Sequence, residues 1–262
     1  MSQALGKVYL VGAGPGAPDL ITLRGARVLA EADIVFYDAL VHPATLDLAP
    51  RAQKVPVGKR CGGLATAQRF INKRLVDAAR RYRTVARLKG GDPMLFGRAQ
   101  EEISALSRAG IDYEVIPGVT AALGAAAEAG VSLTQRGIAR SVAFVTPRVG
   151  DGEAASDWTR SAIAADTVVL YMGAGQAVAI AAALIANGRS PDTPLIVVEN
   201  ATLPDARRFS MRLAELPSIE AYGITGPALI MLGEAFAEAR AAAHTTSTSL
   251  PIENKTRYNS SF

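Results

Sequence analysis

Two segments that contain glycine and proline are the parts of this sequence most suited to holding a ligand. Residues 90–93 (GGDP) follow the apolar stretch 84–88, and residues 12–16 (GAGPG) follow the stretch 7–11. Glycine admits backbone conformations closed to other residues and lets a ligand approach the main chain. Asp92 adds a carboxylate at the carboxyl end of a predicted strand, where open α/β sheets place ligands. Either segment alone fits an ordinary strand-to-helix turn, and the presence of both favours a binding site.

Residues 12–16 (GAGPG) resemble the start of a dinucleotide-binding fingerprint. Gly12 and Gly14 follow a predicted strand, and Asp38 ends the next strand, where a ribose-binding acid would stand. However, Pro15 removes an amide hydrogen where a pyrophosphate needs donors, and Pro18 crowds the start of the phosphate-binding helix. We therefore expect a cofactor without phosphates. An NAD enzyme and a turn without ligand remain the alternatives.

The composition indicates a folded, water-soluble protein. Hydrophobic residues make up 49% of the 262 residues and charged residues 20%, and no run of about 18 apolar residues predicts a membrane span. The start of the chain lacks the pattern of a secretory signal, so we expect a cytoplasmic protein. With Cys61, His42 and His244 as its complete set of cysteine and histidine, the chain offers no disulfide framework and no expected metal. The net charge of +4 fits an anionic substrate or an ordinary surface, and we expect neither a nucleic acid nor a membrane as partner.

The elements that must position these residues form two α/β domains. In the first, strands are expected at 7–11, 33–37, 54–57, 84–88 and 113–116, with helices at 20–32, 45–49, 66–81 and up to 109. This alternation predicts a mostly parallel sheet covered on both faces. In the second, an alanine-rich helix at 121–129 precedes strands at 142–146, 168–172, 195–198, 209–213 and 228–232, with helices at 157–164, 175–186 and 234–243. We expect more antiparallel pairing there, and domain limits of 1–117 and 118–243, with 244–262 a disordered tail.

Six segments of the sequence are similar, in order, to the uroporphyrinogen III C-methyltransferases, which are tetrapyrrole methyltransferases that use S-adenosylmethionine. They are VGAGPGAPDLITLRGARVLAEADIVFYDALV, VGKR, RLKGGDPMLFGR, IPGVTAALGAAAEAGVSLT, VVLYMG and GRSPDTPLIVVENATLPDARR, within about residues 6–236. GAGPG and GGDP mark the wider superfamily. Their combination with YDALV, VGKR, YMG and VENAT is more specific to the uroporphyrinogen enzymes.

The resemblance implies a fold, a reaction and a set of site residues. The fold would be two α/β domains with the cofactor in the cleft between them, in a homodimer. The enzyme would methylate two pyrrole carbons of uroporphyrinogen III, giving precorrin-2 for sirohaem, cobalamin and modified haem synthesis. The implied cofactor contacts are Pro15, Gly90, Gly91, Asp92, Leu95, Thr120, Ala121, Met172, Ala201 and Ala228. Asp38, Lys59, Arg98 and Glu101 would be catalytic, and Arg98, Arg136 and Arg60 would bind substrate.

The residues suit that chemistry. A thioether leaves a sulfonium without needing a proton, so most of the acceleration should come from positioning the acceptor carbon. The methylated ring must then lose a proton, and Asp38 or Glu101 could accept it. The implied substrate carries several carboxylates, and arginines bind carboxylates through two parallel hydrogen bonds. Any single arginine here also fits an ordinary surface ion pair.

The sequence departs from this family on the substrate side. Gly63 and Leu64 stand where a basic residue and a histidine are usual, and Gln135 replaces the histidine of a Thr-His-Arg motif. Residues 99–100 (AQ) and 146–148 (TPR) replace a glycine pair and Thr-Gly-His. Two alternatives therefore stay open. One is a sister precorrin methyltransferase that acts on another carbon, and the other is a protein that binds a nucleotide or tetrapyrrole without catalysis.

Overall fold

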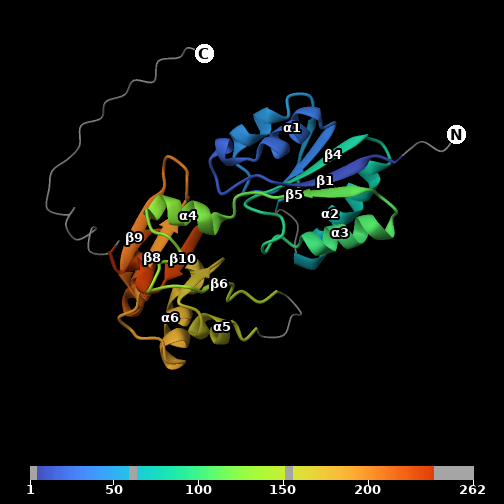
Figure 1. The fold of residues 1–262 in the computed structure, drawn as a ribbon. Helices are drawn as coiled ribbons and strands as arrows, with labels where there is room; N and C mark the ends of the chain where they lie inside the picture. The colour runs from blue at the N-terminus through green and yellow to red at the C-terminus, as the bar shows by residue number, and fades with distance from the viewer. Residues whose placement is uncertain (1–4, 59–63, 151–155, 239–262) are drawn as a thin grey trace, which may run out of the picture.

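The computed structural model describes residues 5–58, 64–150 and 156–238, and for residues 64–67 it describes the backbone alone. These residues form two lobes, each built on a five-stranded sheet (Figure 1). Lys59, Arg60 and the predicted tail lie outside the described residues, so their roles stay predictions. Within the described ranges, no helix has the length and apolar character needed to cross a membrane.

The first lobe contains an entirely parallel sheet, as the alternating pattern predicts. Its strands are β1 (Lys7–Gly12), β2 (Ile34–Tyr37), β3 (Gln53–Pro56), β4 (Thr84–Lys89) and β5 (Tyr113–Ile116), in the order β3-β2-β4-β1-β5. Helices α2 (Leu64–Ala79) and α3 (Ala99–Arg108) cover one face around Leu10, Leu75 and Leu106. Helix α1 (Leu23–Glu31) covers the other face, where Leu29 packs near Leu88. Two 3-10 turns, η1 (Pro18–Leu20) and η2 (Pro43–Leu48), complete the lobe.

The second lobe contains a mixed sheet, which confirms the expected antiparallel character. Its strands are β6 (Val142–Val145), β7 (Thr167–Leu170), β8 (Pro194–Glu199), β9 (Arg207–Arg212) and β10 (Ala228–Leu232). They lie in the order β6-β7-β10-β8-β9, with only the pair β6–β7 parallel. Helix α4 (Ala121–Ala129) packs on one face, and α5 (Trp158–Ala164) and α6 (Ala177–Ala186) pack on the other.

Several details of the second lobe differ from the sequence predictions. Strand β7 ends at Leu170 rather than at Met172, because Met172 adopts a left-handed conformation with φ +57°. The segment Leu213–Tyr222 forms a 3-10 helix, η4, that the sequence did not reveal. The expected helix at 234–243 starts as a 3-10 turn, η5 (Glu234–Phe236), and η3 (Ala174–Gln176) precedes α6.

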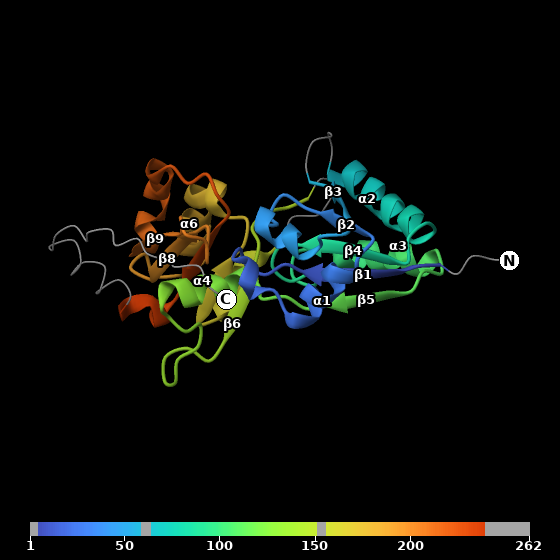
Figure 2. The ribbon, with the colours of Figure 1, turned by 90° about the horizontal axis from the view of Figure 1, so that it is seen from above.

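The order of strands explains why the two glycine loops meet. Strands β1 and β4 are neighbours in the centre of the sheet. After β1 the chain crosses to β2, which lies beyond β4, and after β4 it crosses in the opposite direction to β5, which lies beyond β1. Ligands bind outside the carboxyl ends of strands at such a reversal of strand order. Both glycine loops start at these two carboxyl ends. The connection from β5 to α4 then carries the chain into the second lobe (Figure 2).

Candidate functional site

The two glycine loops are hydrogen-bonded directly to each other. The amide of Gly91 donates to the Gly14 carbonyl at 2.7 Å, and the amide of Gly14 donates to the Gly91 carbonyl at 3.2 Å. Gly14 and Gly91 have φ values of +85° and +67°, which side chains rarely allow. Beside this pair, Ala13 donates to the carbonyl of Lys89 at 2.7 Å. The predicted GAGPG and GGDP segments therefore form one structural unit.

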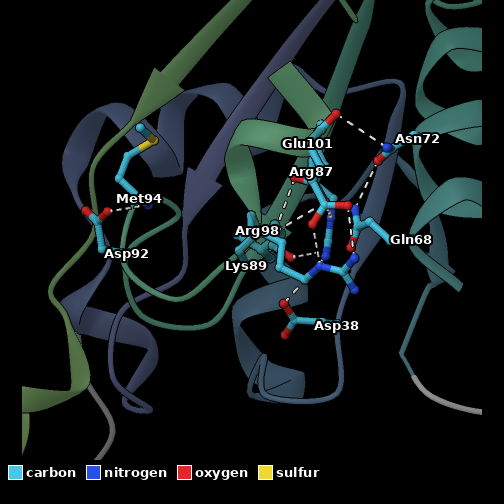
Figure 3. A network of polar contacts seen from close by, with 11 residues as sticks. Asp38, Gln68, Asn72, Arg87, Lys89, Asp92, Met94, Arg98 and Glu101 are labelled. Atoms are coloured by element: carbon cyan, nitrogen blue, oxygen red, sulfur yellow. Dashed lines mark hydrogen bonds and ion pairs between the residues drawn. The ribbon is translucent and has the colours of Figure 1, made fainter. Parts of the chain in front are cut away.

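Asp92 joins this unit to the connection between the lobes. One carboxylate oxygen, Oδ1, accepts a hydrogen bond from the Met94 amide at 2.7 Å (Figure 3). The other, Oδ2, accepts one from the Gly118 amide at 2.9 Å. The backbone crosses so closely here that a Cβ added at Gly118 would lie 2.3 Å from the Gly91 carbonyl oxygen. Asp92 thus acts on the site by holding main-chain segments in register.

The first glycine loop also packs against the second lobe. A Cβ added at Gly124 of α4 would lie 2.6 Å from the Cβ of Pro15, so the proline ring rests directly on that helix. The amide of Ala17 donates to Thr202 Oγ1 at 3.0 Å. A Cβ added at Gly16 would lie 2.8 Å from the carbonyl oxygen of Ala201. Pro15 and Ala201, two predicted cofactor contacts, therefore lie on facing segments of the two lobes.

Tyr171 is a site residue that the sequence analysis missed. Its hydroxyl lies 2.7 Å from Thr120 Oγ1 and accepts a hydrogen bond from the Ala122 amide at 3.1 Å, in the first turn of α4. Its ring lies 4.9 Å, between centroids, from the ring of Phe96 in the first lobe. Burial raises the pKa of the Tyr171 phenol, so it remains protonated and able to donate to Thr120. The signal available in the sequence was its place directly before Met172 in VVLYMG.

Strained backbone is concentrated in the loops after β4, β7 and β8. The non-glycine residues with positive φ in the described part of the chain are Phe96, Arg98, Met172, Asn200 and Thr202, at +50° to +71°. Such conformations cost on the order of 1–3 kcal/mol each and persist only where the surroundings enforce them. Every one of them belongs to a loop that carries predicted site residues. This distribution supports a functional role for these loops.

Glu199 anchors the loop that carries Ala201. Its buried carboxylate accepts hydrogen bonds from the amides of Thr225 and Gly226 at 2.8 and 2.7 Å and from Arg207 Nε at 2.6 Å. Burial alone would raise the pKa of Glu199, but the donors from Gly226, Thr225 and Arg207 outweigh it and hold the pKa below its ordinary value. The loop that follows β8 is thus bonded through Glu199 to the segment that leads into Ala228.

The predicted acid–base and substrate residues lie on several elements. Asp38 follows β2 and is partly exposed, and its Oδ1 accepts a hydrogen bond from the Leu40 amide at 3.1 Å. Arg98 precedes α3 and contacts Glu101 through two parallel hydrogen bonds, Nε–Oε1 at 2.6 Å and Nη2–Oε2 at 2.9 Å (Figure 3). Arg136 is exposed in the turn closed by Gln135 and Ala139, on a hairpin that projects from the second lobe (Figure 2). The structure therefore places Arg98 and Glu101 together and Arg136 on a separate element.

The backbone at Gly91 faces open space. A Cβ added at Gly91 would meet only the Ala121 nitrogen at 3.8 Å and Thr120 Cα at 4.0 Å, so the space above this glycine is open. Met172 leaves 45% of its surface exposed, while Leu95 is partly buried in the GGDP loop. No group of three or more His, Cys, Asp or Glu side chains in the described ranges could hold a metal ion.

Comparison with known proteins identifies a matching protein family and similar curated proteins. The family model described as Tetrapyrrole (Corrin/Porphyrin) Methylases matches residues 7–217. A siroheme synthase of Chromobacterium violaceum is 49% identical over 231 residues, which cover 87% of this chain and 49% of that protein. The chain spans about half the length of the curated relatives it matches.

Two solved structures match over the whole of their length. The native uroporphyrin III C-methyl transferase from Thermus thermophilus superimposes with a TM-score of 0.79 at 43% identity, over 89% of this chain and 100% of that one. The Thermus thermophilus enzyme complexed with S-adenyl homocysteine gives a TM-score of 0.77 at 42% identity, with the same coverage.

The open space at Gly91 generates a prediction with a matched control. Gly91 and Gly110 have nearly the same φ, +67° and +66°, and a Cβ at either position meets nothing closer than 3.8 Å. Gly91→Ala and Gly110→Ala should therefore each lose about 1–2 kcal/mol of stability from backbone strain. Only Gly91→Ala should also weaken S-adenosylhomocysteine binding, by about tenfold or more in titration calorimetry. Equal affinity in the two variants would remove the GGDP loop from the site.

The buried Glu199 carboxylate predicts a pH-dependent stability difference. Its pKa is lowered on folding, so its stabilisation is present above the unfolded value of 4.5 and is lost as the pH falls through the folded pKa. Glu199→Gln should lower the free energy of unfolding by about 2 kcal/mol near neutral pH in urea titrations. This deficit should shrink steadily below about pH 4. The exposed Glu220→Gln serves as control, and a Glu199→Gln deficit independent of pH would contradict the account.

Proposed function

The chain belongs to the tetrapyrrole (corrin/porphyrin) methylases, and we propose that it transfers methyl groups from S-adenosylmethionine to two pyrrole carbons of uroporphyrinogen III, giving precorrin-2. The observation that carries the proposal is the joined pair of glycine loops facing α4, in a chain that matches a solved uroporphyrin III C-methyl transferase over that enzyme's entire length. The matching S-adenyl homocysteine complex supports the choice of cofactor.

The chain's own residues would hold the cofactor mainly through main-chain groups. When bound, S-adenosylmethionine supplies an electrophilic methyl group on a positively charged sulfur. The residues proposed to contact it are Pro15, Gly90, Gly91, Asp92, Leu95, Thr120, Ala121, Met172, Ala201 and Ala228. Pro15 offers no amide hydrogen to a phosphate, which agrees with a phosphate-free ligand. Tyr171 and Asp92 fix the positions of Thr120 and the GGDP loop, so that the cofactor would meet a pre-formed site.

Basic side chains are proposed to bind the carboxylates of the substrate. Arg98 already presents its guanidinium to a carboxylate in the two-bond geometry, with Glu101 as the partner. A substrate carboxylate would share this guanidinium or displace Glu101. Arg136, Arg60 and Lys59 are the other residues proposed to contribute charge to substrate binding or catalysis.

A carboxylate near the reacting ring is proposed to accept the proton released after methyl addition. Asp38 stands at the carboxyl end of β2, next to β4, and leaves about 25% of its side chain exposed. Its orientation is fixed by the Leu40 amide. Glu101 is the second candidate for this role. Because the thioether leaves without a proton, the larger part of the acceleration comes from holding the acceptor carbon in line with the methyl group.

The proposal extends to the setting of the enzyme. We propose a homodimer in the cytoplasm whose product serves sirohaem, cobalamin or other modified haem synthesis. The name of the Chromobacterium violaceum relative, siroheme synthase, is in line with the first of these routes.

The departures on the substrate side favour one second candidate. Gln135 replaces a usual histidine two residues before the hairpin glycine Gly137, and Arg148 follows β6 where another histidine is usual. Changes at such polar positions would alter which tetrapyrrole is accepted while leaving the cofactor loops intact. A sister precorrin C-methyltransferase is therefore the alternative.

Product mass tests the proposed reaction. The enzyme is incubated without oxygen with S-adenosylmethionine and enzymatically generated uroporphyrinogen III, and the oxidised product is analysed by mass spectrometry. A gain of two methyl groups is expected. If no methyl group is gained while S-adenosylhomocysteine still binds, the substrate is wrong and later precorrins become the candidates.

Arg98 gives a more specific prediction. Arg98→Ala should raise KM for the tetrapyrrole by about tenfold or more, because a charge-assisted, two-bond contact is worth on the order of 1.5–3 kcal/mol. Its affinity for S-adenosylhomocysteine should stay within about twofold of the wild type. Arg108→Ala, at the exposed opposite end of α3, is the control for net charge. Equal loss of substrate and cofactor binding would show that Arg98 shapes the cofactor loop instead.

A further inference from the structure

A buried group of charges lies directly beneath the candidate site. Arg87 and Lys89 alternate with Ala86 and Leu88 along β4, so their side chains lie on the same face of the sheet. Each leaves only 3% of its surface exposed, and Glu102 of α3, which meets them, leaves none. Removing three charged groups from water is costly, so their retention in this core calls for a role.

A single carboxylate organises this group. Glu102 Oε1 accepts hydrogen bonds from Arg87 Nε at 3.1 Å, from Lys89 Nζ at 3.2 Å and from Gln68 Nε2 at 3.3 Å. The other oxygen, Oε2, accepts a second one from Lys89 Nζ at 3.2 Å. Burial and the neighbouring Arg87 lower the pKa of Lys89, which Glu102 partly opposes. Figure 3 shows Gln68, Arg87 and Lys89 pointing toward one another between β4 and the helices α2 and α3.

Arg87 connects Glu102 to Asp38, the proposed proton acceptor. Arg87 Nη2 lies 3.7 Å from Asp38 Oδ2, and Arg87 Nη1 donates to the Leu88 carbonyl at 3.0 Å, which fixes the plane of the guanidinium (Figure 3). Among the residues that the structure describes, Glu102 is the one fully buried carboxylate that meets Arg87 and Lys89, and Asp38 is the second acidic side chain near Arg87. Arg87 thereby helps to fix the position of the Asp38 side chain.

A second connection leads to the cofactor loop. A Cβ added at Gly97 would lie 3.1 Å from Lys89 Cε and 2.6 Å from the Pro93 carbonyl oxygen, so the end of this loop rests on the lysine side chain. The carbonyl of Lys89 accepts the hydrogen bond from Ala13 that aligns the first glycine loop. The Glu102–Lys89 ion pair therefore fixes the surface on which residues 90–97 lie.

We propose that Glu102 is a positioning residue for methyl transfer, which holds Asp38 through Arg87 and the Gly90–Gly91 segment through Lys89. The inference rests on the proposed function, because that function gives Asp38 a proton to accept and the loop a cofactor to hold. Methyl transfer depends chiefly on alignment, so a single buried carboxylate that fixes both partners controls the rate without touching either.

The test separates the two connections. Arg87→Gln should lower kcat by about tenfold or more while the affinity for S-adenosylhomocysteine stays within about twofold of the wild type. Lys89→Met should weaken S-adenosylhomocysteine binding by about tenfold, and Lys89→Arg should restore most of it. Glu102→Gln should show both defects, since it removes the charge and keeps the shape. Leu106→Ala, a fully buried residue of the same helix outside the charged group, is the control for lost stability.

Further variants guard against loss of folding. Arg87→Leu, Lys89→Met and Glu102→Met combined replace the charges by apolar side chains, a change that proteins often tolerate. This triple variant should fold by circular dichroism and have no more than about one hundredth of the wild-type kcat. The proposal is overturned if the folded triple variant or Glu102→Gln keeps kcat and S-adenosylhomocysteine affinity within about twofold of Leu106→Ala. It is overturned equally if Arg87→Gln weakens S-adenosylhomocysteine binding as much as Glu102→Gln does.

Failure of the proposed function gives a different result. If the wild-type protein binds S-adenosylhomocysteine but leaves uroporphyrinogen III unchanged, the substrate assignment is wrong. The comparison of Lys89→Met with Arg87→Gln in S-adenosylhomocysteine titrations then still decides whether the buried charges position the cofactor loop.

Discussion

The backbone pairing of Gly14 with Gly91 is the contact on which the candidate site depends. It extends the alignment of β1 and β4 beyond the ends of both strands, and it requires positive φ at both positions. The remaining contacts attach to this pair. Asp92 binds the Gly118 amide, and Pro15 packs on α4 through Gly124. Both loops and the connection between the lobes are therefore arranged around this one backbone pair.

Specific contacts join the two lobes beside the site. The ring of Tyr171 lies near the ring of Phe96, and Thr202 Oγ1 accepts a hydrogen bond from the Ala17 amide. Within the second lobe, the Tyr171 hydroxyl contacts Thr120 Oγ1. Two of these contacts involve residues with positive φ, Phe96 and Thr202, and such conformations persist where the surrounding structure enforces them. A reaction in which the leaving group needs no proton gains most from this kind of rigidity. The architecture thus agrees with a methyltransferase whose main task is alignment.

Features that depend on a few neighbouring residues could be predicted from the sequence. The glycine and proline loops carry their signal in a few neighbouring residues, and the predicted limits of β5 and α4 agree with the structure. Sequence analysis could not find contacts between distant segments, such as Tyr171 with Thr120 or Thr202 with Ala17, which are 51 and 185 residues apart. Two cations in an apolar strand do indicate a buried anion, but nothing local identifies Glu102 as that anion. Met172 looked like a strand end, because a left-handed conformation enforced by tertiary contacts leaves no sequence signal.

The most direct test of the account is a crystal structure of the protein with S-adenosylhomocysteine. We expect the ligand above Gly91, between Ala121 and Ala201, with Met172 against it and the Gly14–Gly91 pairing intact. A ligand bound elsewhere, or bound here only after the two glycine loops have separated, would contradict it.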